Sequence, residues 1–154
     1  MSSLYRDDFY SWGLAQAVAL RRLAELRLND VPELDWRELA EEIEDLSRSL
    51  ERELHSRYAV LLLHLLKWQF QPGHRSGSWQ ASIMNQRHAI ARLLRKNPGL
   101  KARAADEFAD AYAPARLEAA SETGLAPATS PEQCPYPRKS VEDDTFWPGG
   151  EPGL

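Results

Sequence analysis

Residues 64–72 read His-Leu-Leu-Lys-Trp-Gln-Phe-Gln-Pro and end the longest periodic segment of the chain. This periodicity predicts a helix over residues 36–71, about 50 Å long if it is unbroken. The pattern does not decide between one helix and two helices that are broken near residues 47–49. The apolar residues at steps of three or four are Leu39, Ile43, Leu46, Leu50, Leu54, Tyr58, Leu61, Leu65 and Trp68.

Helical signals also dominate the rest of the chain. Further helices are predicted over about residues 8–27, 76–97 and 98–123, with Gly124 as a C-terminal cap of the last one. Pro114 lies inside that helix and should kink it. There is no run of alternating β-branched residues and no tight hairpin signal. We therefore predict an all-α protein, a four-helix-type bundle with one long helix.

The composition changes after residue 125, where prolines favour an extended chain. Phe146 and Trp147 suggest an apolar anchor that docks this C-terminal tail on the bundle. We expect one domain over residues 1–148 and a disordered end over residues 149–154.

The overall composition is that of one soluble domain. The chain has 154 residues, of which 43% are hydrophobic and 27% are charged. The net charge of −4 argues against affinity of the whole chain for nucleic acid or anionic lipid. Cys134 is the only cysteine, which excludes an intramolecular disulfide and a cysteine-rich zinc site. We see no signal peptide and no apolar run that could span a bilayer, so we expect a cytoplasmic protein with no membrane contact.

The long helix places polar residues close to its apolar stripe. With Leu39 as the centre of the stripe, His64 and Trp68 lie about 20° to either side, and Glu42 and Lys67 lie about 60–80° away. In the next helix an arginine falls inside the apolar stripe, where a buried charge needs a carboxylate or backbone carbonyls as partners. We therefore predict an interior polar layer with flanking tryptophans: Glu42, Asp45, His64, Lys67 and Arg87, flanked by Trp68 and Trp79.

Such a layer could carry out acid–base chemistry or could simply fix the register of the helices. The second interpretation is favoured, because structural ion-pair networks commonly resemble active sites. No Glu-x-x-His pair on two helices indicates a metal, and no Gly-rich phosphate loop or catalytic Ser motif indicates a cofactor or a hydrolase.

A basic segment follows the long helix. Between Arg75 and Arg103 there are seven lysines or arginines and no acid. These cations could contact phosphates, or they could form a solvated face beside the acidic stretch that precedes them. The candidate basic patch consists of Arg92, Arg95, Lys96, Lys101 and Arg103.

The chain resembles the bacterial DUF29 family over nearly its whole length. The resemblance implies an all-helical bundle and carries over no catalytic residues, because the family has none established. Two positions depart from the family pattern, Pro114 and Pro137, and they put only the local helix geometry in question. The matching residues are Leu4-Tyr5, Asp7 to Tyr10, Trp12, Asp35-Trp36, Leu39 to Leu46, His64 to Gln69, Gln71-Pro72, Arg75-Ser76, Ser78-Trp79, Ile83, Cys134 to Tyr136 and Phe146 to Pro148.

Three functions are compatible with these residues. The first is a non-catalytic helical module that binds a protein partner or a second copy. The second is association with nucleic acid through residues 75–103, and the third is an enzyme centred on the Glu42, His64 and Arg87 layer. Neither a partner nor a physiological process follows from the sequence.

Overall fold

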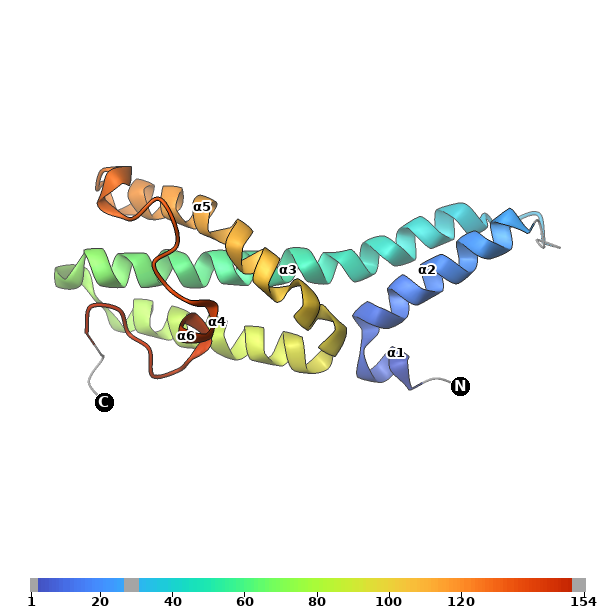
Figure 1. Ribbon diagram of the computed structural model, residues 1–154, viewed down its shortest axis with the longest axis horizontal. Coiled ribbons are helices and arrows are strands. Elements are labelled where there is room, and N and C mark those ends of the chain that lie inside the picture. Colours follow the sequence, from blue (N-terminus) through green and yellow to red (C-terminus); the bar gives the residue numbers. More distant parts are fainter. Residues whose placement is uncertain (1–2, 27–30, 151–154) are drawn as a thin grey trace. The chain divides into compact units, whose positions relative to one another are not determined.

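Every regular element that the structure describes is a helix, which confirms the all-α prediction (Figure 1). The structure is a computed structural model that describes residues 3–26 and 31–150. The number of helices that form one bundle stays a prediction. The elements are α1 (Leu4–Asp7), α2 (Phe9–Glu25), α3 (Trp36–Phe70), η1 (Pro72–His74), α4 (Gly77–Lys96), η2 (Pro98–Arg103), α5 (Ala104–Thr123), η3 (Pro127–Thr129) and α6 (Arg138–Glu142).

The long helix α3 is continuous from Trp36 to Phe70. Asp35 caps its beginning by accepting a hydrogen bond from the Glu38 amide at 3.1 Å. At 1.5 Å per residue its 35 residues span about 52 Å. No break occurs at residues 47–49, which answers the question that the periodicity leaves open.

The chain divides into two compact units, which are described separately. Unit 1 comprises residues 1–53 and 94–102, and unit 2 comprises residues 54–93 and 103–154. The single domain over residues 1–148 stays a prediction.

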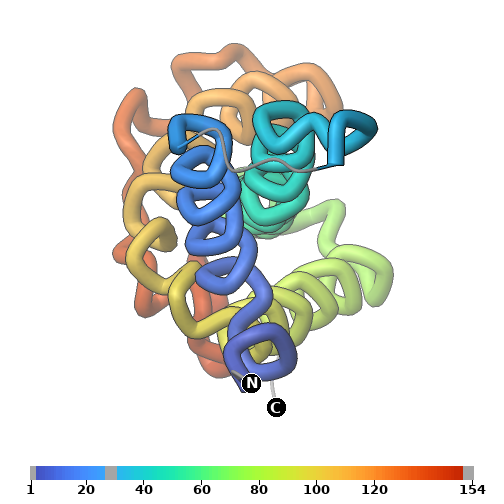
Figure 2. Tube along the Cα trace, turned by 90° about the vertical axis from the view of Figure 1, so that its right-hand side faces the viewer, coloured from blue at the N-terminus to red at the C-terminus, as the bar shows by residue number. Residues whose placement is uncertain are grey.

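In unit 1, α2 lies beside the first half of α3 (Figure 2). Small residues line this contact. A Cβ atom added to Gly13 would lie 1.8 Å from Ser47 Oγ, so the two backbones approach closely. Ala17 and Ala40 are also fully buried. Leu39, by contrast, is 39% exposed. Taking Leu39 as the centre of the buried stripe was therefore wrong in this half of α3, because a close helix crossing selects small side chains.

A polar network joins the start of α2 to the end of α4 within unit 1. Asp8 caps α2 and also accepts a hydrogen bond from the Gly99 amide at 2.7 Å. The Asn97 side chain accepts from the Tyr10 amide at 3.2 Å, and the Tyr10 hydroxyl donates to Glu51 at 3.1 Å. These bonds hold the helix ends in place and satisfy groups that would otherwise be buried without partners.

Unit 2 has the larger apolar core. The second half of α3 is buried on most of its sides, because apolar residues occur all around it between Val60 and Leu66. Helix α5 runs through Pro114, which is exposed, and ends at Gly124, whose φ of +72° is that of the predicted glycine cap. The fully buried large side chains of unit 2 include Leu54, Tyr58, Leu61, Leu62, Leu65, Leu66, Ile83, Ile90 and Val141.

The C-terminal tail packs on unit 2, as the sequence predicts. After α5 the chain forms η3 and the short helix α6, and residues 143–150 then continue without regular structure. Gly149 and Gly150, which we expected to be disordered, make hydrogen bonds to this unit. Residues 151–154 lie outside the described residues, so the predicted disorder is not tested there.

Candidate functional site

Arg87 of α4 binds the tail through backbone carbonyls. Arg87 is buried, with only 3% of its surface exposed. It donates to Val141 O at 2.8 Å, Phe146 O at 2.6 Å and Asp144 O at 3.4 Å. Burial lowers the pKa of Arg87, and the nearby carboxylates of Asp144 and Asp143 oppose that shift. The need for a partner was predicted correctly, and the carbonyls that meet it come from the tail.

Aromatic and cationic side chains alternate beside this contact. The rings of Trp68 and Trp147 pack with their centroids 4.9 Å apart. The Arg75 guanidinium lies 4.8 Å from the Trp68 ring, and that of Arg87 lies 5.2 Å from the Trp147 ring. Each cation therefore faces the negative face of an indole, which is a favourable arrangement in a partly dry site.

The last described residues of the tail are held in the same way. Arg75 donates to Gly149 O at 3.2 Å and to Trp68 O at 2.8 Å. The Trp68 indole donates to Gly150 O at 3.1 Å. We call Trp68, Arg75 and Arg87 the tail groove, because together they bind residues 141–150.

Two tyrosines fix the segment that leads into this groove. The Tyr58 hydroxyl donates to Glu142 at 2.5 Å, and Arg138 donates to the same carboxylate at 3.2 Å. The Tyr136 hydroxyl donates to Gln69 at 2.5 Å. Burial, together with the bond to Glu142, raises the pKa of Tyr58 well above its usual range, and burial likewise raises the pKa of Tyr136.

The predicted interior polar layer does not form with its acids. Glu42 and Asp45 are exposed, and Asp45 pairs with Arg52 at 3.3 Å. Both acids lie in unit 1, on the flank that was misplaced when Leu39 was taken as the buried centre. His64 is half-buried, and its Nδ1 lies 2.8 Å from Val60 O of its own helix.

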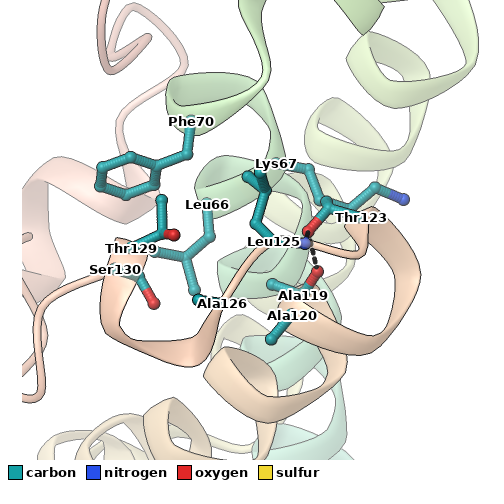
Figure 3. A pocket seen from close by; sticks show the side chains of 10 residues that line it. All are labelled: Leu66, Lys67, Phe70, Ala119, Ala120, Thr123, Leu125, Ala126, Thr129 and Ser130. Atoms are coloured by element: carbon teal, nitrogen blue, oxygen red, sulfur yellow. Dashed lines mark hydrogen bonds between the residues drawn. The ribbon is translucent and has the colours of Figure 1, made fainter.

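The ion-pair partner of Lys67 lies on another helix, because no acid of α3 lies within reach on the same face. Its Nζ lies 2.6 Å from Glu122 of α5 and 4.7 Å from the ring centre of Trp79. Figure 3 shows a small hollow beside it, with a volume of about 20 Å³. That is room for about one water molecule, whereas ligand sites usually measure roughly 300–1,000 Å³. The hollow is lined by Leu66, Lys67, Phe70, Ala119, Ala120, Thr123, Leu125, Ala126, Thr129 and Ser130.

Four of the five predicted basic residues are exposed: Arg92, Arg95, Lys96 and Lys101. They form no ion pair with a residue that the structure describes. Arg103 differs from them, because it pairs with Glu107 at 3.0 Å and with Asp106 at 3.4 Å. Within the described ranges, no three histidine, cysteine or acidic side chains form a group that could hold a metal ion.

Unit 1 exposes an apolar seam that the sequence analysis placed in the core. Leu46 is 57% exposed, and Leu39 is also exposed, while Ile43 and Leu50 are half-buried. The steps of four, three and four residues place all of them within about 60° on one face of α3. We call these four residues the apolar seam.

The residues beside the apolar seam are mostly acidic. Glu53, Glu42 and Glu38 are all exposed and lie about 40°, 60° and 100° around α3 from Leu39. The ion pair of Arg21 and Glu44 lies about 140° around α3 from Leu39, so the seam opens away from it.

The sequence did not predict the bonds of Arg75 to the tail or the bond of Asp8 to Gly99. Arg75 follows a Pro-Gly turn and shows no periodic signal of its own. Asp8 reads from sequence as a helix cap, and its second bond to Gly99 joins positions that are distant in the chain.

These features place the chain among all-helical proteins. Its C-terminal tail is bound by arginine and tryptophan side chains of unit 2. Residues 4–147 match the family described as "Domain of unknown function DUF29". The chain therefore belongs to the DUF29 family, as its sequence motifs predict.

A solved structure has a similar fold. It is the crystal structure of an alpha-helical protein of unknown function from Rhodospirillum rubrum ATCC 11170, with a TM-score of 0.71 and 26% identity. The match covers 92% of this chain and 90% of that one. No curated protein matches the chain. None of the described helices is both long and apolar enough to cross a membrane.

Proposed function

We propose that this protein is a non-catalytic interaction module that binds an amphipathic helix of a partner protein on the apolar seam. The observation that carries this function is the exposure of Leu39 and Leu46, seven residues apart on one helix face. With Ile43 and Leu50 between and after them, they follow the alternating steps of four and three residues of a and d positions, against which a second helix packs. Exposed apolar residues in a contiguous row commonly mark an interaction site.

The charges beside the seam specify the chemistry of the partner. Three exposed acids flank it, Glu38, Glu42 and Glu53, and the whole chain carries a net charge of −4. A helix with lysine or arginine beside its apolar face would complement this surface. A second copy would instead bring acidic flanks together, so the partner we propose is a different chain.

The test uses a designed peptide helix with leucine at its a and d positions and lysine at its e and g positions. We expect this peptide to bind the full chain and its affinity to fall with added salt. Replacing both leucines, Leu39→Gln with Leu46→Gln, should weaken binding at least tenfold, because two buried leucines contribute about 3 kcal/mol or more.

The matched control is Leu117→Gln, because Leu117 is 62% exposed and lies on α5, outside the seam. This variant should bind the peptide like the parent chain. A peptide with glutamate in place of the lysines should not bind. Equal binding of both peptides, or dimerisation of the chain through Leu39 and Leu46, would contradict a basic partner helix.

The second candidate is association with nucleic acid. It is favoured by exposed cations that form no ion pair with any described residue. Arg95, Lys96 and Lys101 of unit 1 are of this kind. Reversing the three charges should then abolish salt-sensitive binding of a DNA or RNA duplex. Unchanged binding would remove this candidate.

We also infer a bacterial origin and a cytoplasmic location. The DUF29 resemblance supports the first. The single cysteine, Cys134, forms no disulfide and suits a reducing compartment.

A further inference from the structure

The tail is recognised by its backbone more than by its sequence. Arg87 bonds the carbonyls of Val141, Asp144 and Phe146. Arg75 and Trp68 bond those of residues 149 and 150. These donors contact carbonyls at the end of helix α6 and in the turns that follow it.

Side chains of the tail add specificity, among them Glu142 through its bond to Tyr58 and Phe146 through its ring contact with Tyr136. Val141 is fully buried in unit 2, and Trp147 packs between Trp68 and the Arg87 guanidinium. Aromatic residues and arginines are also the residues that dominate binding energy at protein interfaces. The contacts of residues 141–150 are thus those of a bound ligand, and none of them depends on its covalent link to α5.

The anchors upstream of the tail place a pivot close to Pro137. Arg116 donates to Ser130 O at 3.1 Å, Tyr112 donates to Pro131 O at 2.5 Å, and Tyr136 is buried against Gln69. These contacts hold the chain up to residue 136 on its own unit, and the ring contact of Tyr136 with Phe146, 5.6 Å between centroids, re-forms with the incoming tail. The 13 residues from 138 to 150 can then reach roughly 40 Å when extended.

We propose that the tail groove is a peptide-binding site that exchanges its own tail for residues 138–150 of a second copy. Each copy carries the same groove and the same ligand, so reciprocal exchange makes the same contacts in a dimer as in the single chain. Exchange of this kind depends on protein concentration, because the tail of the same chain competes at a high effective concentration. It involves unit 2 alone and is independent of the partner helix proposed for the apolar seam.

The first test measures binding of a synthetic peptide with the sequence of residues 138–150 to the full chain carrying Val141→Ala and Trp147→Ala. These substitutions weaken the chain's own tail and leave the groove intact. We expect one peptide to bind per chain by isothermal titration calorimetry. A control peptide with Trp147→Ala should bind at least tenfold more weakly.

Circular dichroism confirms beforehand that the double variant keeps its helices. If it does not, the single variant Trp147→Ala takes its place. No binding by the folded variant, or equal binding of the two peptides, would overturn the proposal.

The second test mixes two full chains that are each defective on one side. Arg87→Lys weakens the groove, because lysine cannot donate to three carbonyls in the arginine geometry. The variant with Val141→Ala and Trp147→Ala supplies the intact groove, and the Arg87→Lys chain supplies the intact tail. Native mass spectrometry should detect a heterodimer in the mixture and more monomer in each variant alone. A mixture that remains monomeric would reject exchange between copies.

Adding Leu39→Gln and Leu46→Gln to both chains should leave the heterodimer unchanged, which separates this result from binding at the apolar seam.

Discussion

Gly13 and Ser47 set how closely α2 and α3 approach in unit 1. The space beside Gly13 is filled by the Ser47 hydroxyl, which has no hydrogen-bond partner among the described residues. A buried hydroxyl in this position costs free energy, whereas a methyl group there would not. The helix crossing therefore requires small side chains at positions 13 and 47, and it does not require the hydroxyl of Ser47.

Replacing Gly13 with alanine should destabilise the chain, and the loss should depend on Ser47. We expect Gly13→Ala to lower the free energy of unfolding by about 1–3 kcal/mol through overpacking. Ser47→Ala alone should raise it by about 1 kcal/mol, because it removes the unpaired hydroxyl. In the double variant the loss from Gly13→Ala should largely vanish. Urea unfolding of the four chains measures this coupling, and strict additivity would show that the two side chains do not compete for space.

Arg87 should be the charged residue of α4 that stability depends on most. Arg87→Met leaves three tail carbonyls without their donor and should lower the free energy of unfolding by about 3 kcal/mol. The control is Arg92→Met on the same helix, where the side chain is exposed and unpaired, and there we expect a change within about 0.5 kcal/mol. Thermal unfolding compares the two variants, and equal losses would mean that Arg87 contributes no more than a surface arginine.

At the scale of elements, sequence periodicity predicted the helices better than their faces. It located α3 and the tail correctly because apolar steps, caps and prolines are local signals. It misplaced the buried face of the first half of α3, since leucine and isoleucine outweigh alanine and serine in any apolar count. Periodicity also could not predict the partners of Arg87. These partners are backbone carbonyls more than 50 residues away, and no side-chain pattern marks them.

The contact between α3 and α6 should make stability depend on pH in the alkaline range. Burial and the bond to Glu142 raise the pKa of Tyr58 in the folded chain, so the folded state retains a proton that the unfolded state loses above about pH 10. The stabilisation is complete below that pH and decreases as pH rises above it, by about 1.4 kcal/mol per pH unit for each such tyrosine.

Tyr58→Phe should therefore make the decrease between pH 10 and 11 shallower, although it also removes the bond to Glu142. Buried Tyr136 contributes in the same direction and should account for part of the remaining slope. Urea unfolding at several pH values gives the slope for each chain. An identical slope for Tyr58→Phe and the parent would show that Tyr58 ionises equally in both states.

For the whole molecule, the fold class and the family follow from the sequence, whereas the division of burial between the two units does not. Among the largest fully buried side chains of residues 3–26 and 31–150, only Leu100 and Ser47 belong to unit 1. The others come from the second half of α3, from α4 and from the tail. The predicted polar layer failed for the same reason, because its acids lie on a stretch of α3 with little packed around it.

We therefore expect two levels of protection from hydrogen exchange along the single helix α3. Amides of residues 40–53 should exchange faster than those of residues 54–70, because local opening is easiest where few apolar side chains are buried. Mass spectrometry of peptic fragments from the native chain measures both segments in one sample.

Binding of the basic peptide helix to the apolar seam should slow exchange in residues 40–53 and leave residues 54–70 unchanged. Trp147→Ala should have the opposite effect, with faster exchange in unit 2 alone. Uniform protection along α3 in all three samples would mean that the helix opens as one cooperative element and that the units are not separate levels of stability.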